Sequence, residues 1–327
     1  MQKFKVGVMG CAAIAERMVI PSIIGCEDLE LIAVASRDIN KARRYAEKFS
    51  CDPIEGYQNL LELRELDIIY MPLPTALHEE WAIKAIRAGK HVLIEKSLAA
   101  NLTEAQNIAN AAKEMNVLVM ENFMFEHHEQ FKVIREILKS GKLGQLRCIR
   151  ASFGFPPFND LSNIRYNKSL AGGALLDAGA YTIKVASLLA ANGLTVQKSS
   201  MVFSEEKEVD IYGGIFLTNS DGLTIQTAYG FDNYYQCELE LWGSKGKLIA
   251  PRIFTAGPGV QVNLTIESDG QSEIIQVKSD NHFVNLLNFF AAKIKLKENY
   301  SILLEELIFQ AELIEQTKVH SIKHYLN

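Results

Sequence analysis

The stretch FKVGVMGCAAIAERM, residues 4–18, decides the fold. Its first six residues are typical of a buried strand, and Gly10 permits a tight turn before a helix-like run. The turn reads G-x-A-x-x-A, where the dinucleotide-binding fingerprint reads G-x-G-x-x-G. A small residue at position 12 still lets the backbone approach a pyrophosphate at the helix N-terminus. A helix start that only needs small residues is the alternative. We expect a cofactor-binding turn made by Gly10, Cys11, Ala12, Ala13 and Ile14.

The rest of the N-terminal part alternates strand and helix patterns. Strand-like runs lie at residues 29–35, 66–71, 91–94 and 117–120, and helical patterns at 14–24, 39–49, after Thr75 and after Thr103. Pro21 is expected to interrupt the first helix, Thr75 to cap the third, and Gly89 to end it. This alternation predicts an α/β fold, a doubly wound parallel Rossmann sheet that binds a dinucleotide over residues 1–122.

The pattern changes after residue 122. A helix is expected over 130–140, a strand over 146–155 and a helical tail over 283–319. Residues 199–277 are expected to form successive strands, among them 201–203, 211–217, 223–229 and 237–242. Consecutive strands joined by tight turns predict a C-terminal α/β domain with a large mixed, mainly antiparallel sheet over residues 123–327. The length of 327 residues agrees with two domains, at roughly 150 residues each. We expect this second domain to bind the substrate and to mediate oligomerisation.

Composition excludes several classes of protein. Hydrophobic residues make up 48% and charged residues 22% of the chain, as in ordinary globular proteins. The net charge is −5 without a long run of either sign, so no nucleic-acid partner is expected. Charged residues, Gly or Asn interrupt every apolar stretch before the ~18 residues of a membrane span, so no membrane association is expected. The N-terminus also lacks the pattern of a signal peptide.

Cysteine and histidine usage argues against disulfides and metal. The five cysteines are odd in number, widely scattered and without a C-x-x-C pair, which favours a reducing cytoplasm. His127 and His128 are adjacent, but adjacent helical residues point apart and no third ligand has a suitable spacing. We expect a cytoplasmic protein without a metal site.

The end of the second strand indicates which dinucleotide binds. Residues 35–38 read ASRD, and no acid stands where an NAD site would hold the ribose diol. Ser36 and Arg37 suit a 2′-phosphate, because a guanidinium offers a planar fork of donors. Asp38 is expected to cap the helix that begins at Ile39. We therefore predict that NADP(H) is favoured over NAD(H).

Further candidate residues follow the strands at 66–71 and 91–94. The segment PLPTALH spans residues 72–78, and Glu95 and Lys96 come directly after the later strand. Ligands of doubly wound folds bind at the carboxyl ends of the strands. A surface ion pair is the alternative for Glu95 and Lys96, but their place at the cofactor edge favours a functional role.

Several motifs together resemble one family. They read GVMGCAAIA at 7–15, ASR at 35–37, PLPTALH at 72–78, AGKHVLIEK at 88–96, ENFM at 121–124 and GGALLDAGAY at 172–181. This set, spread over nearly the whole chain, resembles the glucose–fructose oxidoreductase/inositol dehydrogenase (Gfo/Idh/MocA) family. NIRY at 163–166 and WGSKG at 242–246 look most like the family's NDP-sugar ketoreductases, which reduce 3-keto deoxysugars, with dihydrodiol dehydrogenases nearby.

The resemblance implies roles for individual residues. Lys96 matches the lysine of the family's Glu-Lys-Pro motif, which sits between nicotinamide and substrate and polarises or protonates the carbonyl. Ser97 replaces the proline of that motif, a departure that would loosen or redirect the loop holding Lys96. Asp177 and Tyr181 match the family's Asp-x-x-x-His/Tyr element, in which the tyrosine often shares the acid role. His78 matches a cofactor-proximal histidine, although it would also serve as a satisfied polar group in a helix.

The resemblance also extends the sets of binding residues. Cofactor contacts are expected from Leu73, Pro74, Glu95, Lys96 and Asn122. Arg165, in the loop before the glycines, would reach the cofactor or a substrate phosphate, or would only pair with a surface acid. Tyr234 would line the sugar pocket, and a role as an aromatic at the strand edge is the alternative.

The chemistry supports the catalytic assignments independently. A ketone accepts a hydride only if the charge that develops on its oxygen is stabilised and then protonated. The Lys96 ammonium and the Tyr181 phenol supply both effects, and Asp177 would hold a substrate hydroxyl. The alternative for Tyr181 is a core aromatic. The alternative for Asp177 is a negative charge near the N-terminus of a helix, where the helix dipole favours it. Gly172 and Gly173 imply a close backbone approach that a plain helix start does not need twice.

The sequence therefore predicts an NADP-dependent oxidoreductase that reduces a keto group of a sugar, with an NDP-linked 3-keto deoxysugar as the substrate class. The expected catalytic residues are Lys96, Tyr181 and Asp177, and the expected substrate contacts are these three with Tyr234. A dehydrogenase of a free cyclic polyol or dihydrodiol and a non-catalytic NADP-binding sensor are the alternatives; the catalytic set weighs against the sensor. An open face of the C-terminal sheet and the resemblance imply a homodimer or homotetramer through that face.

Overall fold

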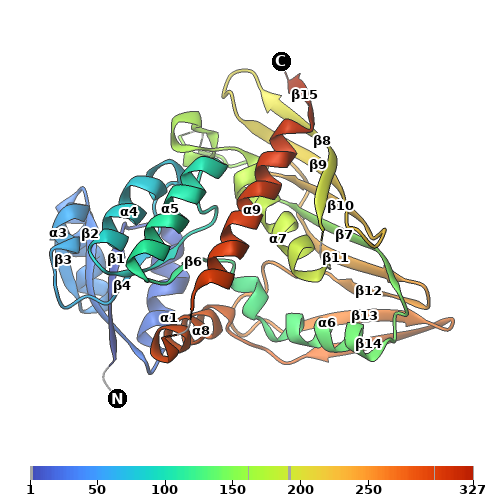
Figure 1. Cartoon of the computed structure of the whole chain (residues 1–327), viewed down its shortest axis with the longest axis horizontal. Helices are drawn as coiled ribbons and strands as arrows, with labels where there is room; N and C mark the ends of the chain where they lie inside the picture. The colour runs from blue at the N-terminus through green and yellow to red at the C-terminus, as the bar shows by residue number, and fades with distance from the viewer. Residues whose placement is uncertain (1–2, 161, 191–192, 298, 327) are drawn as a thin grey trace. The chain divides into compact units, whose positions relative to one another are not determined.

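The computed structural model describes residues 3–160, 162–190, 193–297 and 299–326. The chain divides into two compact units. Unit 1 contains Met1–Asn122 and Phe283–Ala311, and unit 2 contains Phe123–His282 and Glu312–Asn327. Each unit has a β-sheet with helices beside it (Figure 1). Among the described residues, no helix has both the length and the apolar character needed to cross a bilayer.

Unit 1 is built on a six-stranded sheet of order β3-β2-β1-β4-β5-β6. All neighbouring strands run parallel. The direction of winding reverses between β1 and β4, which creates the switch point where doubly wound sheets bind ligands at their carboxyl ends. The expected Rossmann sheet is confirmed. Its strands are β1 (Phe4–Met9), β2 (Leu29–Ser36), β3 (Asp52–Glu55), β4 (Ile68–Met71), β5 (His91–Ile94) and β6 (Val119–Glu121).

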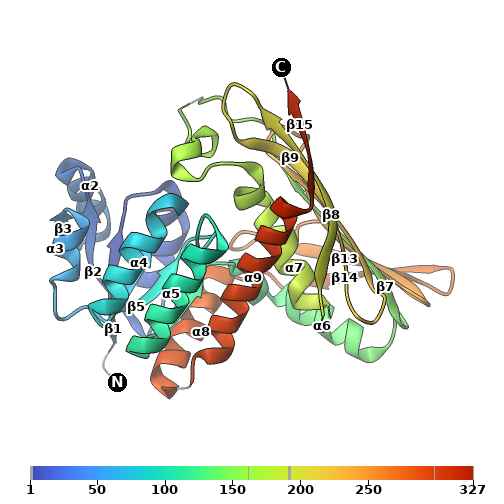
Figure 2. The same cartoon turned by 45° about the horizontal axis from the view of Figure 1, so that its top comes forward.

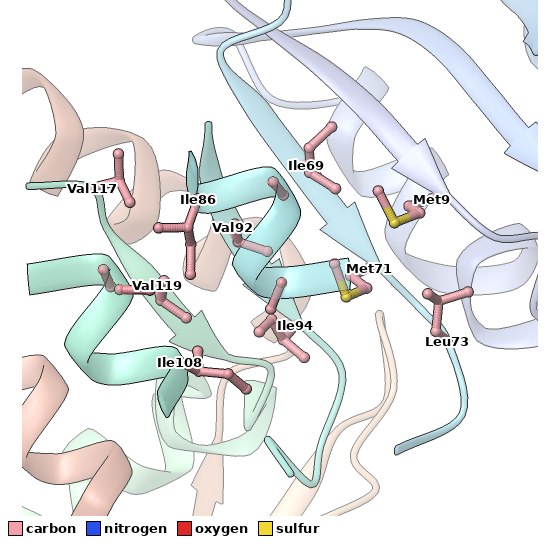
Figure 3. Close-up of a cluster of buried hydrophobic side chains, with 14 of the residues drawn as sticks. Met9, Ile69, Met71, Leu73, Ile86, Val92, Ile94, Ile108, Val117 and Val119 are labelled. Carbon is pink, nitrogen blue, oxygen red and sulfur yellow. The ribbon is translucent and has the colours of Figure 1, made fainter. Parts of the chain in front are cut away.

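The helices of unit 1 bury the apolar faces of these strands. Figure 3 shows Met71, Val92 and Ile94 from the strands among side chains that include Ile86 and Ile108 from the helices. Burying a side chain of this size stabilises the fold by about 1.5–3 kcal/mol. The helices are α1 (Ile20–Ile24), α2 (Ile39–Phe49), α3 (Tyr57–Leu61), α4 (His78–Arg87), α5 (Leu102–Met115), most of α8 (His282–Leu296) and the first part of α9 (Ser301–Val319).

The structure corrects two local expectations in unit 1. Pro21 does not interrupt the first helix, because a π-turn, η1 (Ala15–Val19), places it in the first turn of α1, where its missing N–H is not needed. Thr75 does not cap α4. It already lies inside a 3₁₀ turn, η2 (Thr75–Leu77), whose N-cap is Pro74, and no side chain caps either segment.

Unit 1 also receives a segment from near the end of the chain. Leu304 and Leu307 of α9 belong to the same buried cluster as the strand residues of Figure 3. Lys295 of α8 forms an ion pair with Asp28. Residues 283–311 therefore belong to unit 1, and Leu304 and Leu307 are part of its core.

Unit 2 has a nine-stranded sheet of order β14-β13-β12-β11-β7-β10-β9-β8-β15. Only the pairs β7–β10 and β8–β15 run parallel among the pairings of the described residues, so the expected mixed, mainly antiparallel sheet is confirmed. The strands are β7 (Leu146–Gly154), β8 (Thr195–Ser204), β9 (Asp210–Thr218), β10 (Thr224–Gly230), β11 (Gln236–Gly243), β12 (Gly246–Ala250), β13 (Val262–Ser268), β14 (Gln271–Val277) and β15 (Ser321–Leu326).

Helices pack on one face of this sheet, as Figure 2 shows for α6 and α7. The opposite face presents exposed side chains, because Phe216 and Trp242 alternate with buried neighbours along β9 and β11. The helical segments of unit 2 are η3 (Met124–His127), α6 (Glu129–Ser140), η4 (Ile164–Tyr166), η5 (Lys168–Leu170), η6 (Leu175–Gly179), α7 (Ala180–Leu189) and the end of α9.

Candidate active site

Gly10 turns the chain at the end of β1. Its φ of 123° lies where side chains are disfavoured. A Cβ here would lie 3.0 Å from Leu73 Cδ2 and 3.4 Å from the Pro72 carbonyl oxygen. The Gly10 amide donates to the Ala35 carbonyl oxygen at 2.9 Å. The glycine thus allows the turn to lie directly against the loop after β4, at the carboxyl edge of the sheet.

Small side chains line the turn that follows. Ala12 is half-buried and Ala13 is exposed, and the helix begins at Ala13, so its first amides face this edge. Tyr45 of α2 donates its hydroxyl to the Ala12 carbonyl oxygen at 3.3 Å. Burial raises the pKa of the Cys11 thiol, although Lys41 opposes the shift, so Cys11 is a neutral packing residue. The turn has the shape and the donors of a phosphate cradle.

The segment after β2 separates the roles of three residues. Asp38 Oδ1 accepts the Asn40 amide at 2.9 Å and caps α2, as the sequence predicts. Ser36 is buried, and its Oγ accepts the Asp38 amide at 3.2 Å. Arg37 is exposed. Burial raises the pKa of the Tyr57 phenol, and the nearby Arg37 cation opposes this shift.

His78 connects the loops after β4 and β5. It is fully buried, with Nε2 2.8 Å from the Leu73 carbonyl oxygen and Nδ1 2.9 Å from that of Ser97. All these neighbours are acceptors, so whichever ring nitrogen carries the proton donates to one loop. Burial lowers the pKa of His78 below its ordinary value, against the effect of these carbonyl groups. The histidine therefore joins the loop after β4 to the loop after β5 at the carboxyl edge of the sheet.

Glu95 is held by two donors at the end of β5. Its Oε1 accepts the Tyr70 hydroxyl at 2.7 Å and the Asn122 Nδ2 amide at 2.6 Å. Burial raises the pKa of Glu95, while these hydrogen bonds and the Lys96 charge act in the opposite direction. Sequence reasoning missed Tyr70, although a phenol within the otherwise aliphatic strand IIYM is a visible sign of a polar partner.

Lys96 and Ser97 form the start of the loop after β5. Lys96 is half-buried and Ser97 is buried, and the peptide bond between them is cis. Glu121 of β6 supports the loop by accepting the Leu98 amide at 2.8 Å. Glu121 lies in the ENFM motif but was not expected to contribute to the site. In unit 1 the structure thus brings the predicted residues of the first turn, the loop after β4 and the loop after β5 to one edge of the sheet.

In unit 2, the predicted residues Arg165 and Asp177 form an ion pair. Arg165 Nε lies 2.6 Å from Asp177 Oδ2. The Arg165 guanidinium also stacks on Phe158, 4.7 Å from the ring centroid. The acid that Arg165 meets is therefore the candidate catalytic one. Its side chain is only 12% exposed.

Tyr181 lies four residues after Asp177 on the continuous helix of η6 and α7. Its ring is 7% exposed and contacts four phenylalanine rings, with centroids between 5.2 and 5.9 Å away: Phe123, Phe125, Phe153 and Phe254. Its hydroxyl lies 3.8 Å from Met124 Sδ. The ring of Tyr181 is therefore packed as a core aromatic, which was the alternative interpretation of this residue. Tyr181 also lies about one helical turn after Asp177.

Two glycines and a buried acid set the start of this helix. A Cβ at Gly172 would lie 2.4 Å from the Arg165 carbonyl oxygen, and one at Gly173 only 2.2 Å from Asp210 Oδ1. Asp210 Oδ2 accepts the Leu175 amide at 2.6 Å. Burial raises the pKa of Asp210 to about 6. Sequence reasoning missed Asp210, since an acid before an apolar strand is usually a solvated turn residue.

Tyr234, the further predicted substrate contact, belongs to a loop of unit 2. It is 95% exposed on the turn between β10 and β11. Within the described ranges, no three His, Cys, Asp or Glu side chains come together in a way that could hold a metal ion.

Comparison with known proteins agrees with this arrangement. Residues 4–123 match the model of the GFO/IDH/MocA oxidoreductase family with its NAD-binding Rossmann fold, and residues 131–249 match the C-terminal domain of that family. The dTDP-3,4-didehydro-2,6-dideoxy-alpha-D-glucose 3-reductase of Saccharopolyspora spinosa is 38% identical over 291 residues, which cover 89% of this chain and 87% of the relative. The reductase of the same name from Actinomadura kijaniata is 36% identical, covering 96% and 94%.

A solved structure is similar over the full length. The crystal structure of a 3-ketoreductase from Actinomadura kijaniata in complex with NADP and TDP-benzene has a TM-score of 0.96 and 35% identity, and 100% of both chains is covered. The sequence motifs, the two sheets and these matches lead to the same assignment. The chain belongs to the GFO/IDH/MocA oxidoreductase family.

Proposed function

We propose that this protein reduces the keto group of an NDP-linked 3-keto deoxysugar with NADPH. The observation that carries the proposal is the full-length likeness, at a TM-score of 0.96, to a 3-ketoreductase that binds NADP and TDP-benzene. The two 3-reductases of dTDP-linked didehydro-dideoxyglucose, 36% and 38% identical, support the same substrate class. The family membership and the ion-paired acid on the helix of Tyr181 fit an enzyme better than a sensor.

The carboxyl edge of unit 1 fits a dinucleotide. Gly10 leaves the cradle free of a Cβ, and the first amides of the following helix face it. Asn122 Oδ1 is buried and has no hydrogen-bond partner in the described part of the chain, which is the kind of acceptor that a carboxamide satisfies. Ser36 and Arg37 would hold a 2′-phosphate. When bound, NADPH supplies the hydride that the ketone carbon accepts.

The protein's own residues would manage the charge on the ketone oxygen. Lys96 donates a hydrogen bond to this oxygen and stabilises its developing negative charge. Tyr181 then transfers its phenolic proton to the oxygen, which completes the alcohol. Asp177 accepts a hydrogen bond from a substrate hydroxyl and so fixes the orientation of the sugar. The phenylalanine rings around Tyr181 restrict water near the phenol.

The two parts of the chain would have different functions. We assign dinucleotide binding to residues 1–122, and substrate binding and assembly to residues 123–327, with Tyr234 as a further contact to the sugar nucleotide. All five cysteines are free thiols, which suits the reducing cytoplasm that we propose as its location.

The open face of the unit 2 sheet supports a homodimer or homotetramer. The strand register places Phe216, Gln226, Arg150, Glu240, Ile249, Thr265 and Ile274 in one row across the sheet. The ends of this row, Phe216 and Ile274, are 39% and 68% exposed, and Trp242 is 51% exposed. Analytical ultracentrifugation at micromolar concentration should show a dimer or tetramer that Trp242→Glu weakens. A monomeric wild type would contradict the assembly.

The function is tested by turnover. Purified protein is mixed with NADPH or NADH and with keto sugar nucleotides, free polyols or dihydrodiols, and the absorbance of the reduced nicotinamide is followed. We expect turnover with a dTDP-linked 3-keto deoxysugar and NADPH. Turnover only with a free polyol or dihydrodiol would replace the proposed substrate class.

A further inference from the structure

The backbone of Arg165 is fixed by the two glycines before the helix. The Arg165 carbonyl oxygen accepts the Gly173 amide at 2.9 Å. A Cβ at Gly172 would meet this oxygen at 2.4 Å, so only glycine allows the approach. The Asp177 amide in turn donates to the Gly173 carbonyl oxygen at 3.2 Å. The backbone of Arg165 and the first turn that carries Asp177 therefore form one connected structure.

The side chain of Arg165 is fixed as well. Its Nε donates to Asp177 Oδ2 at 2.6 Å, and its guanidinium stacks on Phe158. Phe158 is itself held, because its backbone amide donates to the Tyr166 hydroxyl at 3.1 Å and its ring packs edge-on against the Tyr166 ring. This support restricts the guanidinium to a small range of positions.

The charge of Arg165 reaches Tyr181 as well as Asp177. Asp177 and Tyr181 are four residues apart on one helix, which makes them neighbours on its surface. Burial acts to lower the pKa of Arg165, but the ion pair and hydrogen bond with Asp177 and the charge of Tyr181 together raise it. The anionic form of Tyr181 is therefore attracted to the guanidinium.

We propose that Arg165 is a positioning residue of the reduction, an inference that rests on the function proposed above. Its guanidinium holds Asp177 as an oriented, ionised carboxylate for a substrate hydroxyl. Arg165 also stabilises the phenolate that forms when the Tyr181 O–H bond breaks and the O–H bond of the product alcohol forms. Water then returns a proton to Tyr181. Arg165 thus acts through two other side chains rather than as a cofactor contact.

The test compares Arg165→Gln and Arg165→Lys with a matched control. Arg135 on α6 offers that control, because it also has one carboxylate partner, Glu126 at 3.5 Å, and one aromatic partner, the Phe131 ring at 4.8 Å. For each variant, kcat and KM for the sugar nucleotide, the pH profile of kcat and the Kd of NADPH are measured. Fluorescence titration gives the Kd without turnover.

We expect Arg165→Gln to lower kcat by about tenfold or more, since it removes a charge that stabilises the reacting groups. The alkaline limb of the pH profile of kcat should move to higher pH. The Tyr181 phenolate loses the cation that stabilises it, so the pKa of the Tyr181 phenol rises. Arg165→Lys should recover part of kcat, Arg135→Gln should stay within about twofold, and the Kd of NADPH should be unchanged throughout. In the double variant Arg165→Gln/Asp177→Asn, the loss should be smaller than the product of the single losses, because the two residues act as a unit. Should Arg165→Gln fail to fold, the lysine variant still shows the shift in kcat.

Three outcomes would overturn the role of Arg165: unchanged kcat and pH profile in Arg165→Gln, losses that multiply in the double variant, or a weaker NADPH Kd that accounts for the whole effect. The failure of the proposed function is distinct, because wild-type protein would then show no turnover with any keto sugar nucleotide. Equilibrium unfolding of the wild type, Arg165→Gln, Asp177→Asn and the double variant measures the coupling of Arg165 with Asp177 without any substrate. A coupling of about twofold or more in the unfolding constant is expected for a direct pair, and its absence would remove the ion pair on which the inference stands.

Discussion

Asp38 Oδ1 accepts the backbone N–H of Asn40 at 2.9 Å and thereby caps α2. This bond directs the acid beside Arg37 to its own helix rather than to a ribose. Asp38→Ala should lower the free energy of unfolding by about 1 kcal/mol, whereas Asp38→Asn, which can still cap, should lower it by a few tenths at most. Urea denaturation measures both. Equal losses in the two variants would show that the cap is not what Asp38 contributes.

Arg37 should decide the preference for NADPH. Removing the guanidinium in Arg37→Ala should weaken NADPH binding by roughly 10- to 100-fold, as expected for a charged hydrogen bond, and leave NADH binding nearly unchanged. Arg87→Ala is the control. Arg87 is also exposed, but it lies in the last turn of α4, at the opposite end of that helix from His78. Fluorescence titration with both cofactors measures the change. Equal affinity of the wild type for NADPH and NADH would contradict the assignment.

Lys96 and Tyr181 should both be needed for proton transfer. Lys96→Met and Tyr181→Phe should each lower kcat far more than they weaken NADPH binding, with a loss of about 100-fold or more for the principal donor. The double variant should lose less than the product of the two, because residues that act together are not additive. Steady-state kinetics with NADPH titrations test this. Near-normal turnover in both single variants would place the acid elsewhere.

Asp210 should make stability depend on pH. Burial raises its pKa from 3.8 to about 6, so the folded state binds this proton more tightly than the unfolded state. The stabilising contribution is therefore fully present when the pH is below the pKa of Asp210 in the unfolded state, 3.8, and is lost as the pH rises through its pKa in the folded state, about 6. Asp210→Asn retains an oxygen for the Leu175 amide and should remove this loss, which amounts to up to about 3 kcal/mol at neutral pH. Urea unfolding at about pH 4 and pH 7.5 measures it, with exposed Asp232→Asn as the control. A pH dependence identical to that of the wild type would refute the prediction.

Gly173 should tolerate no side chain. Its φ is 121°, and a Cβ would lie 2.2 Å from Asp210 Oδ1. Gly222 also has a positive φ, of 80°, but a Cβ there meets nothing within 4 Å. Gly222→Ala should thus cost only the backbone term of about 1–2 kcal/mol. Gly173→Ala should cost more and also lower kcat, because the helix start that carries Asp177 must move. Similar unfolding energies and unchanged kcat would contradict this.

The sequence predicts the fold well where apolar periodicity is strong. It predicts every strand of the Rossmann sheet except β3, because DPIE is short, polar and contains a proline. Such a strand forms at a sheet edge, where Pro53 need not donate to a neighbour. It also misses β15, whose residues are mostly exposed and become a strand through pairing with β8. Edge strands depend on partners far away in the sequence, which local patterns do not reveal.

The candidate site shows a similar division. Gly10 and Lys96 become candidates because they follow strands at the edge where doubly wound folds bind ligands, and Asp177 and Tyr181 become candidates through the family motif that they match. The partners of these residues depend on three-dimensional packing. Asp210, 35 residues from Leu175, becomes visible only when β9 and η6 are placed together. The contact of Arg165 with Asp177 likewise requires the folded loop, so the sequence alone left its partner open between a phosphate and an acid.

Leu304 and Leu307 complete a buried cluster in unit 1. The other buried side chains of this cluster come from the first 122 residues. During synthesis on the ribosome, all six strands of that sheet emerge long before these two leucines. The apolar surface that they cover therefore stays uncovered until almost the whole chain has been synthesised. A nascent or truncated chain that stops at residue 122 presents this surface to water and to chaperones. The first unit to be synthesised can thus be finished only after most of the second has been made.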